Sequence, residues 1–167
     1  IIDKIQSLSN TPKDPKIRDL FRSLGIFINA KEHTAIEKAV FISVFSANNF
    51  NLAQYNEASA LDYEQNILIK IFLRTTSVNL KMQYEKMLQS KSFKEIQNMR
   101  QEALLRYQNI GVNKLYWLEI ATDKLNKLKK IENKIILEVL ELSEAKSLSS
   151  FSDMILIISI TGIIFLY

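Results

Sequence analysis

The segment that decides the fold is Trp117-Leu-Glu-Ile-Ala-Thr-Asp-Lys-Leu-Asn-Lys-Leu-Lys-Lys-Ile-Glu-Asn-Lys-Ile-Ile-Leu-Glu-Val-Leu-Glu-Leu142. Its apolar residues recur every three or four positions, as on one face of a helix of about seven turns. They are Trp117, Ala121, Leu125, Leu128, Ile131, Ile135, Val139 and Leu142. No Gly or Pro interrupts this stripe, so the pattern predicts one long amphipathic helix beginning near Asn113.

Three further helices are predicted upstream, over Lys16 to about Asn49, Tyr55 to Gln89, and Ser92 to Asn109. Each shows apolar residues at helical spacing. Ser92 followed by Glu95 resembles a capping box, and Gly111 is expected to end the third helix. Because no stretch alternates as a strand does, we predict an all-α fold, an antiparallel bundle of about four long helices.

The composition excludes several classes of site. The 167 residues contain no Cys, one His and three Gly, which leaves no disulfide, no thiol nucleophile and no glycine-rich nucleotide loop. No cluster has the quality of a metal site, so we expect no metal, no cofactor and no enzymatic activity. The 22 basic and 18 acidic residues are interspersed, even within the basic run Lys124 to Lys134, which argues against nucleic-acid binding.

The C-terminal run Met154–Tyr167 carries no charge over fourteen residues. We interpret it as the start of a truncated transmembrane helix, with a buried terminal helix as the alternative. The predicted organisation is therefore a helix end and a Pro-containing linker over residues 1–15, a helical domain over 16–150 and the start of a membrane segment over 151–167. Since the sequence begins at Ile1 without Met, it is expected to be part of a longer protein.

Two stretches resemble a known family. Ala30-Lys-Glu-His-Thr-Ala-Ile-Glu-Lys-Ala-Val-Phe-Ile-Ser-Val-Phe-Ser-Ala-Asn-Asn-Phe50 is similar to a signature in the C-terminal half of nitrate- and nitrite-sensing (NIT) domains. Trp117–Glu132 is similar to the closing helix of those domains, and Arg100 lies where the family commonly has an Arg. The sequence departs from the family signature at Ala35, where the family has Gly, and at Lys38, where it has Arg.

The resemblance implies an all-helical sensor outside the cytoplasm, in a membrane-bound bacterial signal-transduction receptor such as a chemoreceptor. It further implies a small anion, nitrate or nitrite, as ligand, and signalling through the last helix. A homodimer is expected, with the membrane reached through the C-terminal helix. The alternative is a ligand-free helical dimerisation or spacer module, whose apolar stripes would face a partner chain.

Four residues are the candidates for ligand binding. Arg offers planar paired donors that suit a flat anion, and Arg100 lies among apolar helical positions; otherwise it would face solvent and pair with Glu95 or Glu102. The resemblance makes Lys38 the replacement for the family's Arg, with Glu37 holding it in place. The alternative for this pair is a solvated helix face with weak intrahelical ion pairs.

Thr76 is the fourth candidate because it belongs to the polar insert Arg74–Asn79 within an otherwise apolar helix. A buried polar layer of this kind needs partners, which a ligand could supply, although plain exposure is the simpler interpretation. His33 is predicted to lie on the surface and Trp117 to anchor the end of the bundle. Thr122 is expected to hydrogen-bond back to its own helix.

Overall fold

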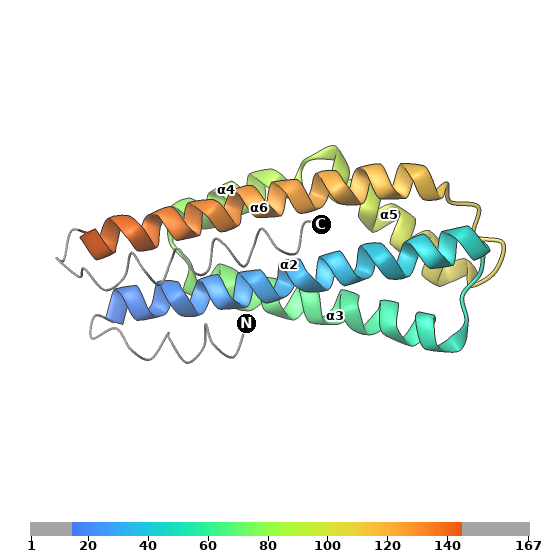
Figure 1. The fold of residues 1–167 in the computed structure, drawn as a ribbon, viewed down its shortest axis with the longest axis horizontal. Coiled ribbons are helices and arrows are strands. Elements are labelled where there is room, and N and C mark those ends of the chain that lie inside the picture. The colour runs from blue at the N-terminus through green and yellow to red at the C-terminus, as the bar shows by residue number, and fades with distance from the viewer. Residues whose placement is uncertain (1–14, 145–167) are drawn as a thin grey trace.

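The computed structural model describes residues 15–144, and this part of the chain forms five helices (Figure 1). They are α2 (Pro15–Ala47), α3 (Leu52–Thr75), α4 (Val78–Leu88), α5 (Lys91–Arg106) and α6 (Lys114–Glu144). No strand occurs in residues 15–144, so the predicted all-α class is confirmed. The expected membrane segment and most of the expected linker lie outside the described residues. Within them, no helix combines the length and the apolar content that a membrane span requires.

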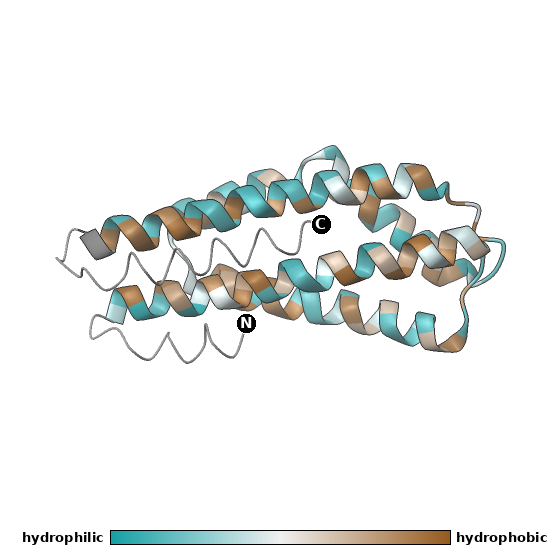
Figure 2. Cartoon of the chain, viewed as in Figure 1, coloured by the Kyte–Doolittle hydropathy of each residue, from teal (hydrophilic) through white to brown (hydrophobic). Residues whose placement is uncertain are grey.

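Helix α2 is the centre of the helical bundle. It packs along α3 on one side and along α6 on the other, so that these three long helices lie side by side in Figure 1. The two shorter helices, α4 and α5, pack against α6. Apolar and polar residues alternate along each helix, as Figure 2 shows. Most of the buried residues are apolar.

The predicted helix from Tyr55 to Gln89 is wrong in one respect, because it is broken in two. Thr76 leaves the helical conformation at φ −88° and ψ 169°, and α4 starts after Ser77. The Ser77 hydroxyl caps α4 by accepting a hydrogen bond from the backbone N–H of Leu80 at 3.3 Å. Hydroxyl side chains compete with the helical hydrogen bonds of the backbone, which is why this polar insert ends one helix and begins the next.

The predicted limits of the third helix are also corrected. Ser90, not Ser92, precedes α5. Ser92 lies inside the helix, is buried and accepts a hydrogen bond from Lys127 Nζ at 3.0 Å. The helix ends at Arg106, because the following residue, Tyr107, has a φ of 59° that stops the helical path before Gly111 is reached. Gly111 adopts a φ of 76° in the following loop, a conformation that favours glycine.

Two loops are joined at the same end of the bundle. The backbone N–H of Phe50 donates to the Tyr107 carbonyl at 2.9 Å, and the Gly111 N–H donates to Asn48 Oδ1 at 2.8 Å. Asn51 forms a capping box with Gln54 at the start of α3. These contacts hold the α2–α3 turn against the α5–α6 turn and so fix the position of α5 relative to α2.

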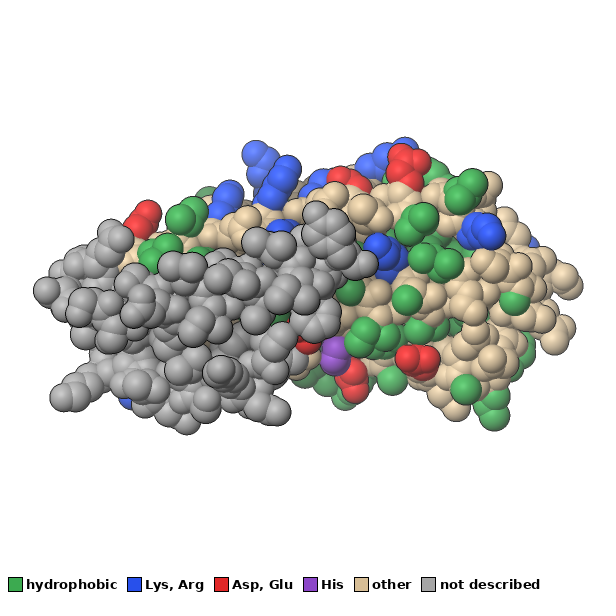
Figure 3. Space-filling view, in the orientation of Figure 1, with side chains coloured by type: hydrophobic (Ala, Val, Ile, Leu, Met, Phe, Trp, Pro, Cys, Tyr) green, Lys and Arg blue, Asp and Glu red, His purple; other side chains and the backbone are tan. Residues whose placement is uncertain are grey.

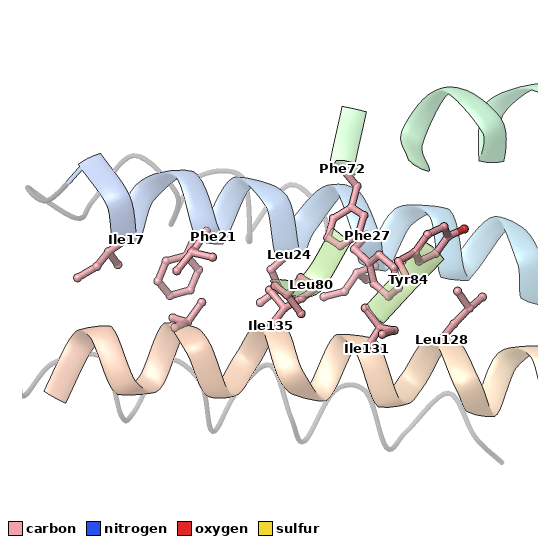
Figure 4. Packing of buried hydrophobic residues seen from close by; sticks show 13 residues of the cluster. Ile17, Phe21, Leu24, Phe27, Phe72, Leu80, Tyr84, Leu128, Ile131 and Ile135 are labelled. Carbon is pink, nitrogen blue, oxygen red and sulfur yellow. The ribbon is translucent and has the colours of Figure 1, made fainter. Parts of the chain in front are cut away.

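The buried apolar residues form two clusters. The Phe27 cluster, shown in Figure 4, joins α2, α3, α4 and α6 through Ile17, Leu20, Phe21, Leu24, Phe27, Ile28, Phe72, Leu80, Tyr84, Leu128, Ile131, Ile135 and Val139. The Trp117 cluster lies nearer the two joined loops and contains Phe41, Val44, Phe45, Phe50, Ala58, Ile96, Met99, Ala103, Ile110, Trp117, Ile120 and Ala121.

The apolar stripe predicted for α6 is confirmed, with Leu125 and Leu142 half-buried and its other members buried. Trp117 is fully buried, and its indole N–H donates to the Lys38 carbonyl at 3.1 Å. Its ring packs on those of Phe41 and Phe45, with centroids 4.9 and 5.2 Å away. This prediction of an anchoring Trp is therefore confirmed. Thr122 Oγ1 donates to the Leu118 carbonyl at 2.7 Å, as expected.

Candidate functional site

A layer of buried polar residues separates the two apolar clusters. Along α2, α3 and α6 its members lie between residues of the Phe27 cluster and residues of the Trp117 cluster. The polar layer consists of Thr34, Glu37, Gln65, Arg100 and Lys124. Charged side chains are rarely buried unless they are paired, so this layer is the first place to look for function.

Glu37 lies at the centre of the layer and is 1% exposed. Its Oε1 accepts a hydrogen bond from Arg100 Nε at 2.5 Å, and its Oε2 accepts one from Gln65 Nε2 at 3.3 Å. Lys124 Nζ lies 3.6 Å from the same Oε2. Burial alone raises the pKa of Glu37, but the charges of Lys124 and Arg100 outweigh it and hold that pKa below its ordinary value. Glu37 is therefore an ionised acceptor shared by three helices.

Arg100 also forms an ion pair with a second carboxylate, that of Asp62. Its side chain is 12% exposed, and its Nη1 donates to Asp62 Oδ1 on α3. The alternative in which Arg100 faces solvent and pairs with Glu95 or Glu102 is thus wrong. Glu102 instead pairs with Arg106 at 3.0 Å.

Lys124 and Thr34 complete the layer around Gln65. The Gln65 Oε1 accepts from Thr34 Oγ1 at 2.8 Å and from Lys124 Nζ at 3.4 Å. Burial lowers the pKa of Lys124 below its ordinary value, because desolvation penalises the ammonium more than Glu37 stabilises it. The layer is thereby hydrogen-bonded from α2 through α3 to α6.

A pocket of about 460 Å³ opens beside this layer, where α3 faces α5. Polar groups from four helices line one part of it: Thr34, Asp62, Gln65, Asn66, Gln97, Arg100, Gln101 and Lys124. Asp62, at 33% exposure, is the most accessible of the charged groups. Two cations and several amides facing one space can bind a small anion. Within residues 15–144, no group of three or more His, Cys, Asp or Glu side chains could hold a metal ion.

Of the four predicted site residues, the structure brings Arg100 and Glu37 together but leaves Lys38 outside the pocket. Consecutive residues of a helix point roughly 100° apart, so Glu37 and Lys38 cannot face the same space. Glu37 holds Arg100 rather than Lys38. The Lys38 side chain is half-buried and makes no hydrogen bond or ion pair within residues 15–144.

Thr76 lies at the break between α3 and α4, apart from the pocket lining. Its hydroxyl is buried and has no hydrogen-bond partner within the described part of the chain. His33 is half-buried rather than fully on the surface, and its Nδ1 lies 3.3 Å from Glu64 Oε2.

Lys124, Gln65 and Asp62 were not among the predicted site residues. A signal for Lys124 was present, since it follows Ala121 by three positions and precedes Leu128 by four, which places it on the apolar stripe. Gln65 has the same relation to Leu61, four residues before it. Glu132, which is buried and contacts Lys31 and Lys129, repeats the pattern about two turns further along α6. Polar residues at core positions of a helix were thus the overlooked signal.

The comparisons with known proteins agree with the resemblance. A family model described as nitrate and nitrite sensing matches residues 1–140, which is most of the chain. No curated protein and no solved structure matches the chain significantly. Sensory domains, not enzymes, make up the matched family. On the strength of this match, the chain belongs to the nitrate and nitrite sensing family.

Proposed function

We propose that this chain is the ligand-sensing domain of a membrane-bound bacterial signal-transduction receptor and lies outside the cytoplasm. It binds nitrate or nitrite in the pocket between α3 and α5, and the last helix conveys the change towards the membrane. The family supports the sensory role. The observation that carries the site is the approach of Arg100 and Lys124 to one pocket lined by side-chain amides.

Arg100 is the main anion donor in this proposal. Glu37 engages its Nε and Asp62 engages its Nη1, so two of the five guanidinium N–H groups have partners in the described residues. The remaining donors suit a planar anion, since the guanidinium fork matches flat oxyanions. The hydrogen bond to Glu37 holds the Arg100 side chain in one orientation, with its remaining donors available to a ligand in the pocket.

Asp62 is the group that an incoming anion displaces. It shares Arg100 with the buried Glu37, yet it alone is substantially exposed. The Asp62 carboxylate can rotate into the solvent at little cost in free energy, whereas the buried Glu37 carboxylate cannot. Exchange of Asp62 for nitrate keeps the charge at Arg100 balanced and removes the direct link between α3 and α5.

The path to the output runs along α6. Lys124 on this helix contacts both Glu37 and Gln65, so a change at the pocket reaches α6 directly. The helix continues without a break to Glu144, the last described residue. A ligand shifts such an equilibrium only by its different affinities for the two arrangements.

The test is titration of the 167-residue chain with nitrate by calorimetry, with chloride and sulfate as comparison anions. Arg100→Lys keeps the positive charge but removes the planar fork, and it should weaken nitrate binding by about tenfold or more, since one ionic hydrogen bond contributes about 1.5–3 kcal/mol. Arg106→Lys is the matched control on the same helix, because Arg106 is exposed and pairs with Glu102 on the same helix. Equal affinities for all three proteins would refute the site.

Asp62→Asn sharpens the same test. Removing the competing carboxylate should tighten nitrate binding several-fold, because the anion then displaces no charge. Glu64→Gln is its control on α3, since Glu64 contacts His33 and not Arg100. A weaker affinity in Asp62→Asn would show that Asp62 supports the site rather than competes for it.

The ligand-free dimerisation module remains the second candidate because α3 carries an exposed apolar stripe. Tyr63, Ile67 and Ile71 recur every four residues and are exposed in this single chain. Analytical ultracentrifugation of Ile67→Glu decides the matter, since a homodimer formed through α3 should dissociate. Dimer loss without any anion binding in the parent would favour the spacer role.

Lys38→Arg tests whether this position reaches a ligand across a dimer. Its nitrate affinity is measured in the same calorimetric titrations.

A further inference from the structure

The pocket has two chemically different ends. Its polar end is described above. Apolar side chains line much of the remainder, among them Ile69, Leu73, Leu88 and Phe93, and Leu104 lies one turn beyond Arg100 on α5. The change from polar to apolar lining occurs along α3 and along α6. Asp62 and Gln65 of α3 give way to Ile69 and Leu73, and Lys124 of α6 gives way to Leu128 one turn later.

Contacts between helices fix the two ends at different levels of the bundle. The ion pair between Arg100 and Asp62 marks the polar end. The apolar end lies beside aromatic rings in edge-to-face contact. The Phe72 centroid is 6.0 Å from that of Tyr84, and the Tyr84 centroid is 6.4 Å from that of Phe93. Phe93 precedes Arg100 by seven helical residues, which corresponds to roughly 10 Å along the axis at about 1.5 Å per residue.

Nitrate uses only a small part of this space. The pocket volume of about 460 Å³ corresponds to about fifteen water molecules at roughly 30 Å³ each, whereas nitrate has a single nitrogen and its oxygens. An anion of that size at Arg100 leaves Leu73, Leu88 and Phe93 in contact with water. Water beside apolar walls is displaced favourably by an apolar group.

We propose that the pocket also takes organic monocarboxylates whose apolar body has the size of a pentyl or phenyl group. The carboxylate replaces Asp62 at Arg100 and reaches Lys124, while the apolar body extends between Leu73, Leu88 and Phe93. This inference rests on the proposed anion site at Arg100 and adds a second class of ligand to it. A carboxylate is planar and offers two oxygens to the guanidinium fork, as nitrate does.

The size of the effect follows from the apolar end. Each buried methylene contributes a factor of about four to affinity. Hexanoate should therefore bind at least tenfold more tightly than acetate, even if only part of its chain is buried. Hexanol lacks the carboxylate and should not compete with nitrate.

The experiment is calorimetric titration of the 167-residue chain in lipid nanodiscs, with empty nanodiscs as the blank for partitioning. The probes are nitrate, acetate, hexanoate and hexanol, followed by hexanoate in the presence of saturating nitrate. Binding of hexanoate that is tenfold tighter than that of acetate, and weakened by nitrate, supports the inference. Equal affinities for acetate and hexanoate overturn it, as does hexanol binding as tightly as hexanoate.

Two Leu variants with matched exposure localise the effect. Leu88 lines the pocket and is 37% exposed, whereas Leu118 on α6 is 39% exposed and lies outside it. Leu88→Asn should remove most of the advantage of hexanoate over acetate and leave nitrate affinity unchanged, while Leu118→Asn should change neither. If both variants keep the full advantage, the apolar body binds elsewhere and the inference is overturned.

The outcomes also separate this inference from the proposed function. Nitrate binding without a preference for hexanoate leaves the anion sensor intact and removes the organic ligand. A preference for hexanoate without nitrate binding supports the organic ligand and contradicts nitrate as the ligand of the pocket. Absence of binding by every probe contradicts both.

Discussion

The polar layer and the Trp117 cluster are neighbours in the same bundle, yet they stabilise it by different physical means. On α2 they are only one turn apart, since Glu37 belongs to the layer and Phe41 to the cluster. The cluster packs four rings, those of Phe41, Phe45, Phe50 and Trp117, in tilted and edge-to-face contacts. The layer instead depends on charges that are stable only when every partner is present.

This difference shows where the bundle can respond to a ligand. Removing water from aromatic surface is non-directional and does not depend on pH. A buried network of carboxylate, guanidinium and ammonium groups has alternative pairings of similar energy, and an anion can select among them. On the part of the surface that Figure 3 shows, basic and acidic side chains both occur. The charges that meet in the interior are those of Glu37, Arg100 and Lys124.

The largest effect is expected from Glu37→Leu. This change leaves Lys124 buried without a carboxylate, and breaking a buried ion pair from one side costs about 3–5 kcal/mol. Urea denaturation followed by circular dichroism measures the loss. Glu64→Leu is the control, because Glu64 is exposed and its contact with His33 contributes below about 1 kcal/mol. Equal stabilities would show that the layer does not need its carboxylate.

Trp117→Phe should cost less, about 1–3 kcal/mol, from lost ring volume and the lost hydrogen bond to the Lys38 carbonyl. The same urea titration measures it. We expect this loss of unfolding free energy to stay constant between pH 4 and 7, because no titrating group of the layer contacts the indole. A loss that grows on acidification would mean that the two regions are coupled.

The pH dependence of the polar layer is the third test. The folded state lowers the pKa of Glu37 below its ordinary value of 4.5. The unfolded chain therefore binds the proton first, so stability is present above about pH 4.5 and is lost as the pH falls through the lower folded pKa. The effect is smaller than that of Glu37→Leu because burial opposes the two cations. Between pH 6 and pH 2, the denaturation midpoint of the parent should decrease as the pH is lowered. The midpoint of Glu37→Gln should depend less on pH.

The smallest effect is expected at Asp123. A hydrogen bond from Lys127 lowers the pKa of this carboxylate too, but its side chain is 49% exposed and water screens the pair. Asp123→Asn should therefore cost below about 0.5 kcal/mol. Thermal unfolding of the two proteins at the same ionic strength measures the difference. A loss comparable with that of Glu37→Leu would contradict the importance of burial in this comparison.

The sequence by itself determined the helical class, the long α6 stripe and the buried Trp117, because apolar spacing reports which face of a helix leaves water. It also singled out Arg100 and Glu37. It did not locate the break at Thr76, since whether a Ser/Thr run interrupts a helix depends on what can pack against both halves. The sequence also placed the end of the third helix too late, at Gly111. The helix ends earlier because Tyr107 adopts a positive φ.

Only the tertiary structure decided the partners within the polar layer. Arg100 lies 63 residues from Glu37 and 38 from Asp62 in the sequence, and no local pattern relates such positions. Lys38 is adjacent to Glu37 in the sequence, but the helical turn of roughly 100° sends it elsewhere. Lys124 and Gln65 occupy apolar positions of their helices, and they are stable there because α2 brings Glu37 between them. Periodicity assigns each residue to a face of its own helix, whereas the packing of the helices chooses which charges meet.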